Sequence, residues 1–70
     1  MGAMKDHAKK ILAADISTRR GIPLAAADDL IEHIQSEIYA YENGETPYET
    51  VAELFADYGI PVYLQWVFEV

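Results

Sequence analysis

Cysteine is absent from this 70-residue chain, and that single absence removes several classes of protein. Disulfide scaffolds, thiol catalysis, iron–sulfur clusters and cysteine-type zinc sites all need thiols. The chain also lacks any apolar run of the ~18 residues that a membrane-spanning helix requires. Its four glycines are isolated and form no phosphate-binding loop. We therefore expect a protein without cofactor or metal that does not enter a membrane.

The N-terminus lacks the apolar core and cleavage site of a secretory signal, which predicts a cytoplasmic protein. Residues 1–3 precede a second methionine, so we expect them to be an expression remnant and residues 4–70 to form one small domain. Ordering 70 residues costs on the order of 100 kcal/mol, which burial in so small a core barely offsets. A partner subunit is a common supplement, so we expect a homodimer.

Lysine and arginine are missing from the last fifty residues. Residues 1–20 carry five cations and two carboxylates, a net charge of +3, whereas residues 21–70 carry ten carboxylates and no cation, a net charge of −10. An acidic surface repels nucleic-acid phosphates and attracts basic proteins. The charge distribution therefore predicts a protein partner with a basic surface and makes direct nucleic-acid binding an unfavoured alternative.

Three segments have apolar residues at helical spacing. The first starts at Lys5 and ends between Ser17 and Arg20, before Gly21 and Pro23. The second covers residues 23–42, and the third covers residues 47–58, ending at Gly59. Thr46, Pro47 and Glu49 suggest a capping box at the start of the third helix. The expected fold is mainly α, with three short helices in a compact cluster.

The C-terminal segment, residues 62–70, is rich in β-branched and aromatic residues, which favours a strand. One face of that strand would carry Val62, Leu64, Trp66 and Phe68, and we expect these four residues to form the oligomer interface. A lone strand has unpaired backbone groups, so it would pair with its own copy or with the sheet of another protein. The alternative is a fourth short helix, giving a four-helix mini-bundle whose core Trp66 and Phe68 cap.

A row of carboxylates is the strongest candidate for a binding site. The expected acidic face consists of Glu45, Glu49, Glu53 and Asp57. Residues four apart on a helix are roughly 6 Å from each other, a separation similar to that of phosphates along a nucleic-acid strand. The row fits either a basic protein surface in general or, as an alternative, mimicry of nucleic acid toward a DNA-binding protein of the kind that phages and plasmids block. A plain solvated face is the simpler interpretation.

Other constellations carry less chemistry. Asp29, His33 and Glu37 align along the second helix, but the outer two lie two turns apart, too far to hold one metal ion. The two serines, Ser17 and Ser36, lie in no nucleophile motif. We therefore expect no enzyme.

Five tyrosines add interface-type side chains with an apolar body and a polar end. A small DNA-binding regulator that uses Lys5, Lys9, Lys10, Arg19 and Arg20 remains a second alternative. The sequence favours a small acidic interaction protein, a regulator or inhibitor that occupies a basic or edge-strand surface of a partner macromolecule.

Overall fold

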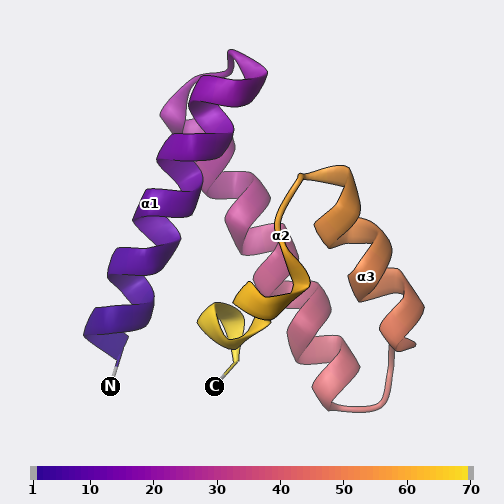
Figure 1. The fold of residues 1–70 in the computed structure, drawn as a ribbon. Helices are drawn as coiled ribbons and strands as arrows, with labels where there is room; N and C mark the ends of the chain where they lie inside the picture. Colours follow the sequence, from indigo (N-terminus) through magenta and orange to yellow (C-terminus); the bar gives the residue numbers. More distant parts are fainter. Residues whose placement is uncertain (1, 70) are drawn as a thin grey trace.

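A computed structural model describes residues 2–69, which form three α-helices and one 3-10 helix. In chain order these are α1 (Gly2–Arg20), α2 (Leu24–Glu42), α3 (Tyr48–Asp57) and η1 (Val62–Phe68) (Figure 1). The prediction of a mainly α fold is confirmed. None of the described helices is long and apolar enough to cross a membrane.

The C-terminal ends of α1 and α3 lie beside glycines, as the sequence predicts. Gly21 and Gly59 have positive φ angles of 65° and 68°; Gly21 follows the last residue of α1, and Gly59 follows Tyr58, the C-cap residue of α3. After Gly21, the Ile22 N–H donates to the Ser17 carbonyl at 3.1 Å, and after Gly59, the Ile60 N–H donates to the Phe55 carbonyl at 2.8 Å. Such bonds satisfy carbonyls that a helix end leaves free. The predicted C-terminal ends of the three α-helices are confirmed to within one residue.

The predicted capping box at the start of α3 is wrong. Pro47 occupies the N-cap position in an extended conformation, and no side chain forms a cap hydrogen bond there. The ψ angle of Pro47 is 153°, outside the helical region, so the helix begins one residue later than expected. Pro23 likewise precedes α2 as its N-cap residue.

The core lies where the four helices meet, and its buried hydrophobic side chains come from all of them and from the loop before η1: Ala13, Ile16, Ala27, Ile31, Ile34, Ile38, Val51, Phe55, Ile60, Val67 and Phe68. The rings of Phe55 and Phe68 pack edge to face, with centroids 5.7 Å apart and an interplanar angle of 71°. This contact joins α3 to η1 through the centre of the molecule.

The predicted C-terminal strand is also wrong: residues 62–68 form a 3-10 helix, and residue 70 of the predicted strand lies outside the described residues. A lone strand leaves its backbone groups unpaired on both sides. The 3-10 turns pair some of them locally, through Leu64 N–H to the Pro61 carbonyl at 3.0 Å and Glu69 N–H to the Trp66 carbonyl at 3.2 Å. Pairing between subunits through a strand therefore loses its basis, and the four-helix alternative is closer to the structure.

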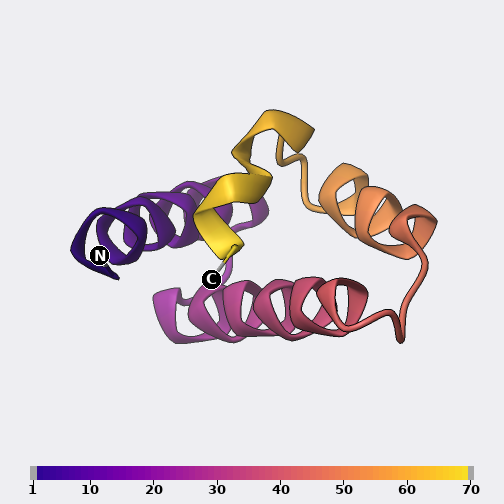
Figure 2. The ribbon, with the colours of Figure 1, turned by 90° about the horizontal axis from the view of Figure 1, so that it is seen from below.

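The C-terminal segment packs against its own chain. Both views show η1 between α1 and α3, and η1 packs on α1 and α2 (Figures 1 and 2). The Gln35 side chain of α2 donates to the Phe68 carbonyl at 2.5 Å, and the Lys5 ammonium of α1 donates to the Glu69 carbonyl. Two helices thus hold the carbonyl groups at the end of η1.

Candidate functional site

The acidic face predicted from the sequence is present on the surface. Glu45, Glu49, Glu53 and Asp57 are all exposed, and the last three lie on α3 at four-residue spacing. Glu45 lies just before α3, where its N–H donates to the Ala40 carbonyl at the end of α2 with a distance of 2.8 Å. That bond fixes the backbone of Glu45 relative to α2.

The amphipathic pattern of α3 keeps these carboxylates in water. Val51 and Phe55 are buried in the core, and Leu54 and Tyr58 pack partly against it. Residues three and four apart share one face of a helix, so the apolar set occupies one side and leaves the acidic set on another. Because burial of an unpaired carboxylate is costly, this orientation is strongly fixed.

Among the described residues, no lysine or arginine forms an ion pair with a carboxylate of the acidic face. Within residues 2–69, the one ion pair joins Asp15 and Arg19, both on α1, with Nε and Oδ2 2.8 Å apart. None of the carboxylates that follow residue 20 pairs with a lysine or arginine in that part of the chain. The polarity of charge seen along the sequence is thus retained in three dimensions.

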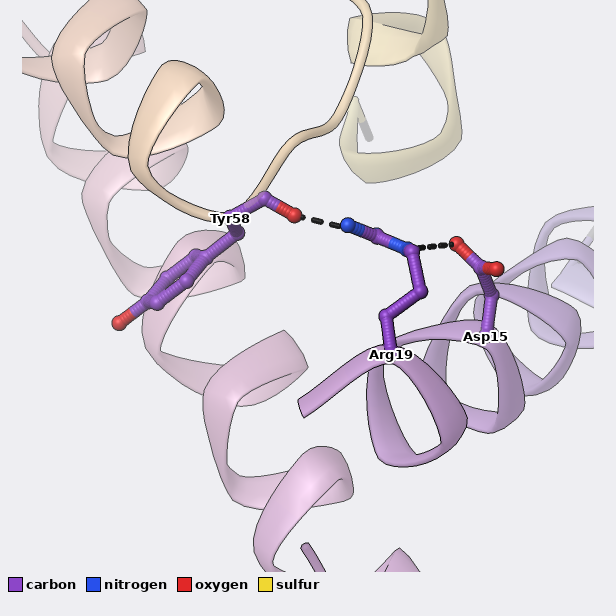
Figure 3. A network of polar contacts seen from close by, with 3 residues as sticks. All are labelled: Asp15, Arg19 and Tyr58. Atoms are coloured by element: carbon purple, nitrogen blue, oxygen red, sulfur yellow. Dashed lines mark hydrogen bonds and ion pairs between the residues drawn. The ribbon is translucent and has the colours of Figure 1, made fainter. Parts of the chain in front are cut away.

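The two arginines at the end of α1 bind main-chain carbonyls at the end of α3. Arg19 Nη2 donates to the Tyr58 carbonyl at 3.1 Å while its Nε contacts Asp15 (Figure 3). Arg20 Nη2 donates to the Asp57 carbonyl at 2.6 Å, and its guanidinium carbon lies 4.9 Å from the centre of the Tyr58 ring. Cations are favourable at a helix C-terminus, where carbonyl groups are unpaired. We call this set of contacts the arginine clamp.

Sequence reasoning assigned Arg19 and Arg20 to the C-terminus of their own helix and missed the clamp on α3. The basic end of α1 thus binds α3 through carbonyl oxygens and through no carboxylate of that helix. A signal existed at Gly59, which the sequence analysis used only as a helix end. A Cβ atom there would lie 2.6 Å from Nη1 of Arg19, so a larger residue at this position would displace the flexible end of that side chain.

The four residues predicted as an oligomer interface do not share a face. Phe68 is fully buried, with an exposed fraction of 0%, and Leu64 is half-buried against the core. Val62 and Trp66 are exposed at 48% and 42%. The 3-10 helix repeats every three residues, so alternate residues point in different directions.

Several tyrosine side chains are exposed on the surface. Tyr63 of η1 is 77% exposed, and Tyr39 and Tyr48 are also on the surface. The Tyr48 ring packs against Tyr41, with centroids 5.5 Å apart. Tyrosines with an apolar body and a free hydroxyl are typical of protein interfaces.

The polar residues of α2 stay apart from this face. Asp29, Glu32 and His33 are exposed and Glu37 is half-buried. Over residues 2–69, no three histidine or carboxylate side chains are grouped in a way that could hold a metal ion.

Comparisons of this chain with known protein families, with curated proteins and with solved structures find no match.

Proposed function

We propose that this protein is a small acidic protein–protein interaction module, a regulator or inhibitor that occupies a basic surface of a partner macromolecule. The observation that carries the proposal is the acidic face: Glu45, Glu49, Glu53 and Asp57 are all exposed, and none of their carboxylates forms an ion pair within residues 2–69. Like charges at this spacing cost about 0.2–0.5 kcal/mol per pair in the free protein. A cationic partner would relieve that repulsion and would be attracted over long range.

The proposal rests on charge and does not include addition of a strand to a partner's sheet, because residues 2–69 contain no strand. The exposed ring of Tyr48, the first residue of α3, supplies apolar contact area on the same helix as the carboxylates. Electrostatic attraction contributes speed and specificity of encounter, whereas aromatic anchors contribute most of the lasting affinity of an interface.

The test compares three immobilised proteins for capture from a cell lysate, followed by quantitative mass spectrometry. They are the wild-type chain, the α3 variant E49Q/E53Q/D57N, and the matched control D29N/E37Q/E42Q, which removes the same number of charges from α2. We expect basic proteins that bind the wild type and the control and are lost from the α3 variant. Equal capture by all three proteins would refute the assignment of the binding site to α3.

Mimicry of nucleic acid is the second candidate function, and the one-turn spacing of the α3 carboxylates favours it. It predicts that a captured partner binds duplex DNA and that DNA displaces the protein from it. Displacement is expected because both ligands would occupy one phosphate-binding groove. Affinity should also fall steeply with salt, because the contacts in such a groove are between charges. A captured partner that binds DNA and this protein simultaneously would exclude mimicry while leaving the general proposal in place.

Direct DNA binding by α1 receives less support. Lys5, Arg19 and Arg20 already donate hydrogen bonds to carbonyl groups of the same chain. A gel-shift measurement with duplex DNA distinguishes an acidic interaction protein from a DNA-binding regulator. We expect no shift by the wild-type protein; a shift that K9A/K10A abolishes would favour the regulator instead.

A further inference from the structure

A groove between α1 and α2 lies apart from the acidic face and takes no part in the proposed function. Its volume is about 380 Å³, and it is lined by Asp6, Lys9 and Lys10 of α1 and by Asp28, Ile31 and Glu32 of α2. Ile31 belongs to the core, so the bottom of the groove is apolar. We call the α1 residues the basic rim and the α2 carboxylates the acidic rim.

The charges of the two rims are free within the described chain. No hydrogen bond or ion pair of residues 2–69 involves the ammonium groups of Lys9 and Lys10 or the carboxylates of Asp28 and Glu32. The other three cations of the chain are all bound to carbonyl oxygens. The two lysines of the groove are therefore the cations that remain available to a partner.

The mixed sign of the groove restricts its partner. A strongly basic surface would be attracted by the acidic rim and repelled by Lys9 and Lys10. A polyanion would be attracted by the two lysines and repelled by the acidic rim. The partner that fits presents an acidic edge to the basic rim and a basic edge to the acidic rim, side by side at the same spacing. A second copy of this chain has that arrangement.

We propose that the groove is a self-association surface at which two copies meet through a two-fold axis running along it. Such an axis places the basic rim of each copy over the acidic rim of the other, so every contact occurs twice. Lys9 and Lys10 of one copy then face Asp28 and Glu32 of its partner, and α1 packs antiparallel to the partner's α2. An axis across the groove would instead put like rims together.

The expected dimer is weak, because two copies that each carry a net charge of −7 repel one another over long range and only the rims attract. A standard interface takes about 800 Å² per partner, just under a fifth of the 4497 Å² surface of this chain. The groove residues supply only part of that area, and exposed ion pairs are individually weak. Screening at high ionic strength removes most of their attraction, because the Debye length falls to about 3 Å at 1 M salt.

The test is sedimentation equilibrium of four proteins up to about 1 mM in low-salt buffer, a range that detects weak association. Besides the wild type they are K9E/K10E, D28K/E32K, and the quadruple variant K9E/K10E/D28K/E32K. We expect the wild type to dimerise and each double variant to lose about tenfold or more in dimer affinity, because the contacts of Lys9 and Lys10 with Asp28 and Glu32 then join like charges. An equimolar mixture of the two double variants, and the quadruple variant alone, should recover dimers, since opposite rims meet again.

The matched control is E49K/E53K on α3, which makes the same change of charge as D28K/E32K and should dimerise about as well as the wild type. Circular dichroism and a thermal melt check that each variant is folded. A wild type that stays monomeric, double variants that dimerise like the wild type, or a mixture that fails to recover would each overturn the proposal. If a double variant does not fold, the quadruple variant provides the test. A quadruple variant that is folded but monomeric would refute the two-fold arrangement. Loss of partner capture by α3 variants leaves this result unaffected, so the two proposals fail separately.

Discussion

Replacing Gly59 with alanine tests the arginine clamp, and replacing Gly21 provides its control. Both glycines end a helix with nearly the same positive φ, 68° and 65°, so the conformational penalty for alanine is the same at both. That penalty is about 1 kcal/mol of unfolding free energy. The surroundings differ: nothing lies within 4 Å of a Cβ at Gly21, whereas a Cβ at Gly59 would meet Nη1 of Arg19 at 2.6 Å.

The guanidinium of Arg19 must therefore move when Gly59 becomes alanine. Its side chain is flexible, so the movement itself costs little, but it removes the 3.1 Å hydrogen bond to the Tyr58 carbonyl. A bond of this kind is worth about 0.5–1.5 kcal/mol, and partial exposure of Arg19 favours the lower half of that range. We expect G21A to destabilise the protein by about 1 kcal/mol and G59A by about 0.5–1 kcal/mol more.

Urea denaturation followed by circular dichroism measures both values, and a double-mutant cycle isolates the clamp. In an R19A background the obstacle is gone, so G59A should cost no more than G21A costs in the wild type. Equal destabilisation by G59A and G21A in the wild type would refute the clamp as a stabilising contact. So would an excess cost of G59A that persists after Arg19 is removed.

Three further predictions follow from burial, hydrogen bonding and charge. Phe68→Ala should lower the unfolding free energy by about 3–5 kcal/mol, since the side chain is fully buried, whereas Trp66→Ala should cost under about 1 kcal/mol; equal losses in urea titrations would contradict a tail that packs on its own helices. Gln35→Leu should cost about 1 kcal/mol through loss of the bond to the carbonyl of Phe68, and thermal melts that leave the midpoint unchanged would show that the bond contributes nothing. Glu53→Gln should raise stability by about 0.2–0.5 kcal/mol at low ionic strength by removing repulsion with Glu49 and Asp57 on α3, and a gain that survives in 1 M salt would have a cause other than charge.

Local signals determined the parts of this fold that the sequence predicted. Gly21 and Gly59 mark helix ends because the left-handed conformation that closes a helix is open to glycine at little cost, and that requirement is independent of the rest of the fold. The apolar spacing of Ile31, Ile34 and Ile38 likewise identifies α2 and its buried side without knowledge of its neighbours. The exposed side of α3 follows from the same reasoning, because the apolar residues Val51 and Phe55 are buried on the other side.

The tail was predicted wrongly because its conformation depends on contacts that the local sequence does not contain. Val62, Val67 and the aromatic residues favour a strand on composition, but strand preference mostly measures how well a residue suits a pleated, half-buried surface. No second strand exists among residues 2–69 to provide that surface. Packing of Phe68 against Phe55, together with the carbonyl bonds from Lys5 and Gln35, selects the 3-10 helix instead.

The distribution of cations connects the fold to the two proposals. Arg19 and Arg20 act at the carbonyl end of α3, where they oppose the negative end of the helix dipole without approaching the carboxylates of Glu49 or Glu53. The helix is thereby anchored to α1 while its acidic face keeps its charge. Had the same arginines paired with those carboxylates, α3 would be held equally well but would present little field to a basic partner. Lys5 anchors the end of η1, and Lys9 and Lys10 are left for the α1–α2 groove, where a compact, mobile ammonium suits a weak, reversible contact. The division of five cations between anchoring and recognition thus predicts that arginine variants lower stability and that K9E/K10E lowers self-association.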